Sequence, residues 1–239
     1  PENQKFDSFK NLKNLLSKFP KMKDLDLASE VSTKNIYKWQ KGKKTRIKNF
    51  KKKFIAVIDF GIKRNILNIL NSLGLEVIIF PINFSIKEII KLKPSGIFLS
   101  NGPGDPLATF NKYKEDFKLI KHFTKPVFGI CLGHQILSLI YNAKTEKMHH
   151  GHRGANHPVK DLKTKKVEIT VQNHGFVVSK KSFPKILNVT HSSLFDGTIA
   201  GVEVRKKPFF SVQYHPESSP GPQDSRYLFK KFIKLMKNA

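Results

Sequence analysis

Hydrophobic residues between positions 54 and 130 occur in short unbroken runs, and amphipathic segments lie between these runs. The runs predict buried strands at 54–58, 76–80, 96–100 and 127–130, and the segments between them predict helices at 63–73, 85–92 and 111–123. Ser85 followed by Glu88 has the spacing of a capping box for the second helix. Unbroken apolar strands that alternate with helices are typical of a parallel sheet covered on both faces. We therefore predict an α/β fold with a mostly parallel central sheet.

The pattern changes after a further predicted helix at 133–141. Extended segments follow, and a last amphipathic helix is predicted at 225–237. This part of the chain is predicted to be smaller and rich in β-structure, with extended segments at 167–171, 186–191, 201–204 and 209–213.

The first fifty residues have a different character. Apolar residues at helical spacing predict a helix over 5–19 that ends at Pro20, a short helix is indicated within 22–31, and an extended piece begins at Tyr37. The lysine-rich stretch 42–53 is predicted to be a linker. About fifty residues of this kind cannot form an independent core, so residues 1–50 are predicted to be the tail end of a preceding domain.

The net charge of +26 raises the hypothesis of nucleic-acid binding. The lysines are spread along the whole chain, however, and no known nucleic-acid module occurs, so a solvated basic surface is favoured. No apolar run approaches the roughly 18 residues of a membrane span. The single cysteine excludes an internal disulfide and favours a reducing, intracellular setting. We expect a cytoplasmic protein with neither nucleic acid nor membrane as its partner.

That cysteine, Cys131, lies between the predicted strand 127–130 and the predicted helix 133–141. The spacing Gly129-x-Cys131-x-Gly133 has the form of a nucleophile elbow with a thiol in place of the hydroxyl. Flanking glycines permit the sharp turn, and the helix N-terminus favours a thiolate. The alternative is a buried core cysteine, because free cysteine is among the most buried residue types.

A base and its orienting group are indicated at Tyr214-His215-Pro216-Glu217. Pro216 biases His215 toward extended geometry, in which residues two apart point the same way. Glu217 can then hold one imidazole nitrogen while the other meets a thiol, as in a cysteine triad. The motif alone is also compatible with a surface turn, and its pairing with Cys131 favours the triad.

Three other stretches could bind a ligand. The loop 100–106, with Gly102 and Gly104, follows a strand and can offer backbone N–H groups to an oxyanion, although a plain turn has the same composition. Segment 172–176, with Asn173, Gly175 and Phe176, would suit a small polar ligand at a strand end, with a hairpin turn as the alternative. The histidines between 149 and 157 suggest a metal, but their crowding, the absence of carboxylates and the glycines favour a loop without metal.

Together these motifs resemble the class I (triad) glutamine amidotransferases, and within them the small, glutamine-hydrolysing chains of carbamoyl-phosphate synthetase. The resemblance covers about residues 54–239 and extends weakly into 20–40. It rests on the segments 100–106, 129–135, 151–158, 172–176, 193–198 and 215–222.

The resemblance implies roles for individual residues. Cys131 is expected to be the nucleophile, His215 the base and Glu217 its orienter. The residues expected to hold glutamine and the oxyanion are Gly102, Gly104, Leu132, Gln135, Asn173, Gly175 and Phe176.

The resemblance also implies a partner. Ammonia released from L-glutamine is expected to pass to a carbamoyl-phosphate synthase large chain, which uses bicarbonate, ATP and magnesium for arginine and pyrimidine synthesis, so this chain itself needs no cofactor or metal. Residues 1–50 are expected to be the remnant of the family's N-terminal domain with a linker, and 54–239 the amidotransferase domain. The alternatives are an amidotransferase subunit of another synthase and an inactive regulatory module.

Overall fold

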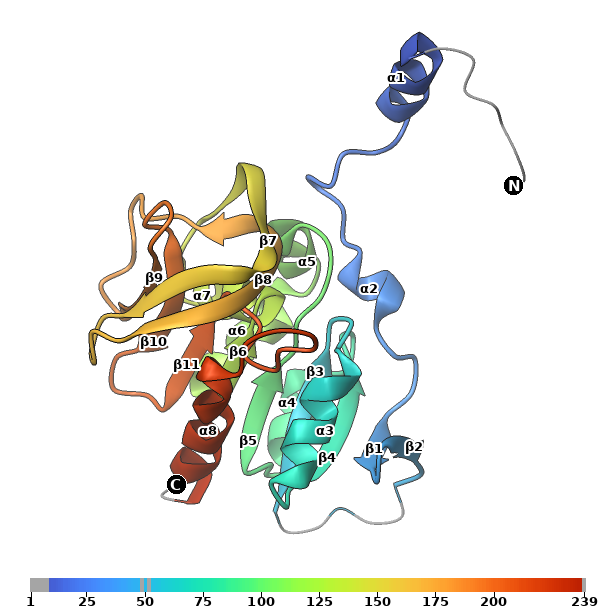
Figure 1. Ribbon diagram of the computed structural model, residues 1–239. Coiled ribbons are helices and arrows are strands. Elements are labelled where there is room, and N and C mark those ends of the chain that lie inside the picture. The colour runs from blue at the N-terminus through green and yellow to red at the C-terminus, as the bar shows by residue number, and fades with distance from the viewer. Residues whose placement is uncertain (1–8, 48–49, 51–52, 238–239) are drawn as a thin grey trace.

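The computed structural model describes residues 9–47, 50 and 53–237. Its framework is one twisted sheet with helices packed against its middle (Figure 1). The strands are β1 (Tyr37–Gln40), β2 (Lys43–Thr45), β3 (Phe54–Asp59), β4 (Glu76–Pro81), β5 (Gly96–Leu99), β6 (Val127–Ile130), β7 (Thr145–Asp161), β8 (Val167–Val178), β9 (Leu187–Ser193), β10 (Ile199–Val204) and β11 (Phe209–Val212). Their order is β2-β1-β4-β3-β5-β6-β11-β10-β9-β7-β8.

The parallel part of the sheet runs from β4 through β3, β5 and β6 to β11. Alternate residues of a strand face opposite sides, so β3 buries Ala56 and Ile58 in one apolar core and Ile55 and Val57 in another. Both faces are therefore covered, which confirms the predicted α/β architecture. Because neighbouring parallel strands end at the same edge, the loops after β3, β5, β6 and β11 meet there.

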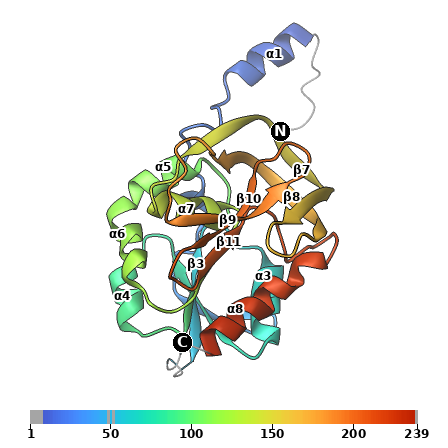
Figure 2. The ribbon, with the colours of Figure 1, turned by 90° about the vertical axis from the view of Figure 1, so that its left-hand side faces the viewer.

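Helices α3 (Arg64–Ser72) and α8 (Tyr227–Lys237) cover one face of the sheet, and α4, α5, α6 and α7 cover the other (Figure 2). The helix predicted at 111–123 is instead three shorter pieces, and the first begins earlier, where Asp105 caps it by accepting from Leu107 N–H at 2.8 Å. The pieces are α5 (Pro106–Lys112), α6 (Lys114–Lys118) and a 3₁₀ turn, Leu119–His122; α4 spans Ile86–Lys91 and α7 Leu132–Ile140.

The capping box predicted at Ser85 is wrong. The Ser85 hydroxyl does not cap α4; the Asp116 carboxylate of α6 accepts the Ile86 N–H at 2.8 Å and the Ser85 hydroxyl at 3.4 Å. A carboxylate from a neighbouring helix thus satisfies one of the orphan N–H donors in the first turn of α4, in place of a cap from the local serine. Sequence spacing identified the start of the helix but not the group that caps it.

The β-rich part of the chain is larger than predicted. The extended segment predicted at 167–171 continues as β8 to Val178, and the histidine-rich stretch expected to be a loop belongs to the long strand β7, paired with β8. Register shifts flank Gly151 and Gly154, whose φ angles are 75° and 147°. These glycines therefore mark β-bulges, which a strand can accommodate, rather than a loop.

The N-terminal segment is joined to the rest of the fold by several contacts, of which two sets bear on the sheet edge and on the loop after β5. Strand β1 pairs antiparallel with β4, and β2 continues the sheet, so residues 43–45 of the expected linker form an edge strand. Farther upstream, Asp105 N–H donates to Leu25 O and the Asp105 carboxylate accepts from Asp24 N–H, both at 2.9 Å. A Cβ at Gly104 would lie 2.8 Å from Leu25 O, so glycine permits this close approach.

Two helices precede β1 in the described part of the chain: α1 (Phe9–Ser17) and the short α2 (Ala28–Val31). Helix α1 stands apart from the sheet in both views (Figures 1 and 2). The first residues of the helix predicted at 5–19 lie outside the described residues. None of the helices in the described part of the chain is long and apolar enough to cross a membrane.

Candidate active site

Cys131 lies in a sharp turn between β6 and α7, as the elbow motif predicts. Its φ and ψ are 53° and −103°, which is a strained conformation for a residue with a Cβ, and its N–H donates to Val212 O at 2.9 Å. The flanking glycines are required by packing, since a Cβ at Gly133 would lie 2.1 Å from Leu99 O and one at Gly129 would lie 2.6 Å from Gly133 O. The turn places the sulfur at the N-terminal end of α7.

His215 and Glu217 follow β11 and lie beside this turn. His215 Nδ1 is 2.7 Å from Glu217 Oε1, and both side chains are almost completely buried. Burial lowers the pKa of His215, but the Cys131 sulfur and the Glu217 carboxylate raise it, to about 9 overall. Burial raises the pKa of Glu217, but the bond to His215 and the charge of Lys63 lower it below its usual value. At neutral pH the site therefore holds an imidazolium between a sulfur and a carboxylate.

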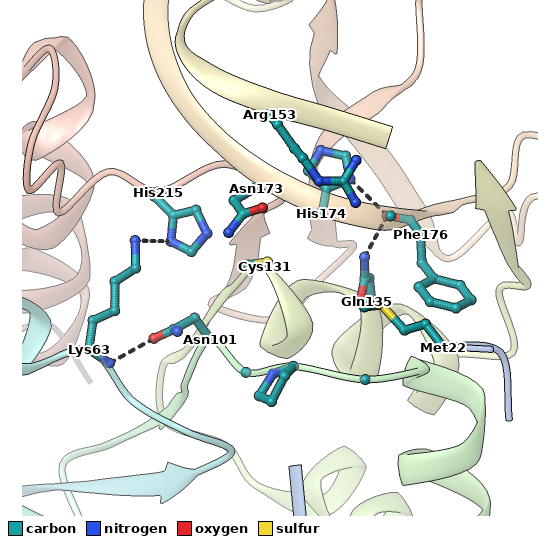
Figure 3. Close-up of a pocket in the computed structure, with 14 residues that line it drawn as sticks. Met22, Lys63, Asn101, Cys131, Gln135, Arg153, Asn173, His174, Phe176 and His215 are labelled. Carbon is teal, nitrogen blue, oxygen red and sulfur yellow. Dashed lines mark hydrogen bonds between the residues drawn. The ribbon is translucent and has the colours of Figure 1, made fainter. Parts of the chain in front are cut away.

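Lys63 completes this charge arrangement, and sequence reasoning missed it. Its Nζ lies 3.1 Å from Glu217 Oε1 and 3.3 Å from His215 Nδ1 (Figure 3). The other carboxylate oxygen of Glu217 is buried and has no hydrogen-bond partner among the described residues. Lys63 follows the turn after β3, and loops at the carboxyl ends of parallel strands lie at one edge of the sheet. The position of Lys63 just after a predicted parallel strand was therefore the signal in the sequence that could have identified it.

We expect Lys63→Met to lower the free energy of unfolding by about 1 to 3 kcal/mol, because the buried Glu217 carboxylate loses one of two cationic partners. Chemical denaturation at neutral pH would measure this. Lys91→Met is the matched control, since Lys91 pairs with Glu88 at 2.7 Å and both side chains are more than half exposed. Its loss should cost less than about 1 kcal/mol. Equal effects of the two substitutions would contradict the expectation.

A cavity of about 300 Å³ opens in front of Cys131. Figure 3 shows its walls: the loop after β5 lies on one side, strands β7 and β8 on another, and Met22 comes from the N-terminal segment. Among the residues predicted for the site, those that line it are Gly102, Gly104, Cys131, Gln135, Asn173, Gly175, Phe176 and His215. The other lining residues, not predicted, are Met22, Lys63, Asn101, Pro103, Arg153 and His174.

Two predicted residues lie next to the cavity without lining it. Glu217 lies behind His215 and contacts its Nδ1. Leu132 is the first residue of α7, so the Leu132 N–H has no acceptor within the helix. Gly102 faces it: a Cβ there would lie 2.2 Å from Phe60 O and 2.9 Å from Leu132 Cδ2. The backbone of Gly102 can lie this close to Phe60 and to the Leu132 side chain only because it has no side chain of its own.

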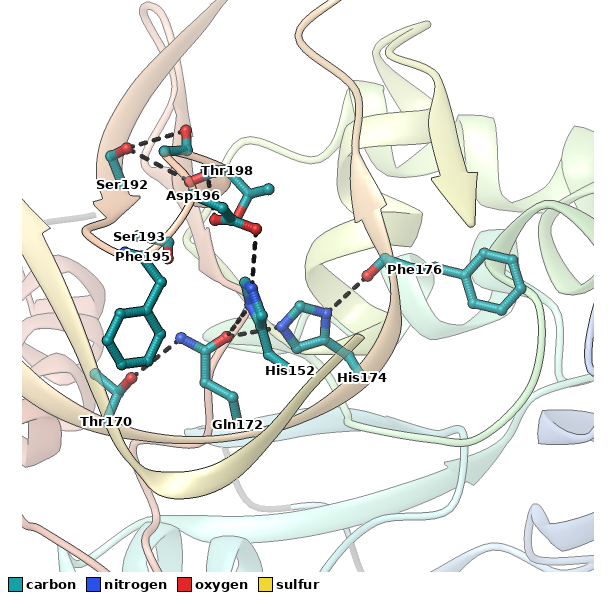
Figure 4. A network of polar contacts seen from close by, with 11 residues as sticks. His152, Thr170, Gln172, His174, Phe176, Ser192, Ser193, Phe195, Asp196 and Thr198 are labelled. Carbon is teal, nitrogen blue, oxygen red and sulfur yellow. Dashed lines mark hydrogen bonds and ion pairs between the residues drawn. The ribbon is translucent and has the colours of Figure 1, made fainter. Parts of the chain in front are cut away.

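The β8 wall is held by buried polar groups. Phe176 O accepts from Gln135 Nε2 at 2.7 Å and from His174 Nδ1 at 2.9 Å. His174 Nε2 is 2.7 Å from Gln172 Oε1, which is 3.2 Å from His152 Nδ1 (Figure 4). Burial lowers the pKa of His174 to about 3, so this imidazole is neutral.

The far end of this network is Asp196. Its carboxylate lies 3.0 Å from His152 Nε2, and its other oxygen accepts from the Thr198 N–H and hydroxyl. Of the β7 histidines, His152 is thus engaged with an amide and a carboxylate. Within the described part of the chain, no three His, Cys, Asp or Glu side chains are arranged to hold a metal ion.

Comparison with known proteins identifies the family. Residues 56–235 match the model of glutamine amidotransferase class-I. The chain is 50% identical over 232 residues to the carbamoyl phosphate synthase small chain of Bartonella bacilliformis and 50% identical over 220 residues to that of Agrobacterium fabrum. These alignments cover 95% and 89% of this chain but 58% and 55% of the relatives, so the chain spans a little over half the length of the curated relatives it matches.

Solved structures agree with the fold. A Thermoplasma acidophilum protein described as one component of a GMP synthase superposes with a TM-score of 0.68 over 78% of this chain and 94% of its own, at 24% identity. A glutamine amidotransferase of Thermotoga maritima superposes with a TM-score of 0.54 over 77% of this chain and 82% of its own, at 17% identity. With the family model matching three quarters of its length, this chain belongs to the class-I glutamine amidotransferases.

Proposed function

We propose that this chain is the glutamine-hydrolysing small chain of a carbamoyl phosphate synthase. The observation that carries the proposal is the placement of His215 between the Cys131 sulfur and the Glu217 carboxylate at the wall of an open cavity. The identity of about 50% to carbamoyl phosphate synthase small chains supports this branch of the family over others.

In the proposed first step, the Cys131 thiolate attacks the side-chain amide carbon of glutamine. The amide oxygen becomes an oxyanion, which accepts from the N–H groups of Leu132 and Gly102. Such donors act by being fixed in place before charge develops. Leu132 meets this condition as the first residue of α7, and Gly102 is held against Phe60 by tight backbone packing.

In the second step, the carbon–nitrogen bond breaks and the His215 imidazolium donates a proton to the departing nitrogen, which leaves as ammonia. The neutral imidazole then takes a proton from water, and the hydroxide formed attacks the γ-glutamyl thioester. Glutamate leaves and the thiolate is restored. Glu217 keeps His215 Nδ1 engaged, so that the other ring nitrogen faces the sulfur.

Glutamine is the proposed ligand of the cavity, held by Gly104, Gln135, Asn173, Gly175 and Phe176. Each of these lines the cavity, and the Gln135 amide nitrogen is already bound to Phe176 O and Gln213 Oε1, which fixes its carbonyl oxygen in place. This chemistry uses no cofactor in this chain. ATP, magnesium and bicarbonate belong to the proposed partner, the large chain that receives the ammonia.

Two further expectations stay predictions. Residues 1–50 are proposed to be the end of the small chain's N-terminal domain, with 54–239 as the amidotransferase domain. A cytoplasmic location is proposed from the lone cysteine, which fits a reducing compartment.

The test is reconstitution of the full protein with a carbamoyl phosphate synthase large chain, bicarbonate and ATP. We expect glutamate and carbamoyl phosphate to form together from glutamine. Absence of glutamate, with or without the large chain, would overturn the hydrolase assignment. Release of glutamate without any glutamine-dependent carbamoyl phosphate would overturn the assignment of the partner and leave the hydrolase assignment standing.

A further inference from the structure

The candidate glutamine cavity has a cation at its mouth that the proposed reaction does not use. Arg153 lies on β7 and lines the cavity together with Cys131 (Figure 3). Its cross-strand partner in the β7–β8 register is Asn173, and directly paired residues project from the same face of a sheet. Arg153 therefore stands beside the part of β8 that is proposed to hold the substrate.

The guanidinium group lies near two glycines, and its space depends on the absence of a side chain at one of them, Gly151. A Cβ at Gly151 would lie 2.9 Å from Arg153 Nη1, and a Cβ at Gly175 would lie 3.8 Å from Nη2. One edge of the guanidinium donates to His150 O, which fixes the group at the cavity mouth. Arginine presents five donors in a planar fork, so this single anchor leaves donors for a ligand.

Among the described residues, no carboxylate forms an ion pair with Arg153. The described residues that line the cavity include no aspartate or glutamate, and the other lining cations, Lys63 and His215, are both already paired with Glu217. The mouth of the cavity thus offers one uncompensated positive charge to whatever enters.

Resting on the proposed function, we infer that Arg153 binds the α-carboxylate of the glutamine substrate and so selects an amino acid over a simple amide. Glutamine carries its only anionic group at the end opposite the reacting amide, four carbon–carbon bonds or roughly 5 Å away when extended. With the amide at Cys131, the carboxylate lies toward the mouth, where a guanidinium matches its planar, bidentate geometry.

The test compares L-glutamine with L-glutaminamide, in which an uncharged amide replaces the α-carboxylate. For Arg153→Met we expect kcat/KM for glutamine to fall roughly 10- to 100-fold, through a higher KM. The kcat/KM for hydrolysis of the side chain of glutaminamide should change less than about twofold, because that substrate has no charge to lose. Arg153→Lys should recover part of the affinity for glutamine.

Two controls separate this role from a structural one. Arg205→Met removes the same charge from an exposed position after β10 that does not line the cavity, and it should leave both substrates unaffected. The rate at which iodoacetamide alkylates Cys131 should be the same in Arg153→Met and the unmodified protein, since this reagent lacks a carboxylate.

Each other outcome overturns the inference. An equal fall for both substrates, a slower alkylation of Cys131, or an unchanged KM for glutamine would show that Arg153 does not recognise the carboxylate. A full protein that hydrolyses neither substrate would overturn the proposed function as well, whereas an active protein that is insensitive to Arg153→Met overturns this inference alone.

Discussion

Replacement of Cys131 by serine is expected to lower glutamine hydrolysis by at least about 10⁴-fold, since a triad enzyme that loses its nucleophile can lose about 10⁶-fold in kcat. The structure gives the physical reason. His215 is an imidazolium at neutral pH, with a pKa of about 9 that depends partly on the sulfur beside it. A thiol can supply the thiolate that pairs with this cation, but a serine hydroxyl gives up its proton far less readily. The variant would retain the cavity and lose the nucleophile.

The same substitution should leave ammonia-dependent synthesis by the reconstituted complex unchanged, since external ammonia bypasses Cys131. Glutamate release and carbamoyl phosphate formation are measured side by side, with glutamine or an ammonium salt as the nitrogen source. Serine differs from cysteine by one atom, so the free energy of unfolding serves as a folding control. Glutamine-dependent synthesis at the normal rate in Cys131→Ser would refute the proposed mechanism.

Gly133→Ala is the second substitution for which we expect a large effect. A Cβ at this position would lie 2.1 Å from Leu99 O and 2.6 Å from Leu99 C, both of which are backbone atoms of the central sheet. Neither can move without disturbing β5, so helix α7 must shift away from the sheet. Overpacking of this kind costs about 1 to 3 kcal/mol or more in the free energy of unfolding. Because α7 begins at Leu132, the shift also displaces the Leu132 N–H and the Cys131 sulfur.

The measurements are denaturant unfolding and glutamine hydrolysis on the same preparation of Gly133→Ala. Gly175→Ala provides a control for stability, since the atoms nearest to its Cβ are the ends of the Lys147 and Arg153 side chains, at 3.6 and 3.8 Å. That variant should unfold within about 1 kcal/mol of the unmodified protein, as expected for a substitution whose neighbours can move. A Gly133→Ala protein of normal stability and activity would show that α7 is not fixed by this contact.

Local patterns in the sequence were enough to predict the parallel half of the fold. The strands from β3 to β6 are continuous apolar runs because both of their faces are buried. Such runs can be recognised in a sequence without knowing which strands pair with one another. Cys131 was located by the glycines on both sides, since the elbow is a local feature. His215 and Glu217 were paired by spacing within three residues.

The missed features all depend on contacts between distant segments. Lys63 is 152 positions from His215, and Asp116 caps a helix that begins thirty residues earlier. Strand β7 carries glycines and histidines typical of loops, and it is ordered by its register with β8 rather than by its own composition. In the sequence, Arg153 is only one residue of a polar stretch. Its position beside Asn173 results from the β7–β8 register, which the local sequence does not reveal.

The contact between the N-terminal segment and the loop after β5 affects whether the region that follows can be separated from that segment with its cavity intact. Met22 forms part of the cavity wall, and the backbone around Leu25 is bound to Asp105 beside Gly104. The region that matches the family model begins only at residue 56. A fusion protein that contained only that region would keep Cys131 and His215. It would lack Met22, which lines the cavity, and the Leu25 backbone that binds Asp105. In this protein, the unit that evolution or an engineer could move intact is larger than the region that the family model matches.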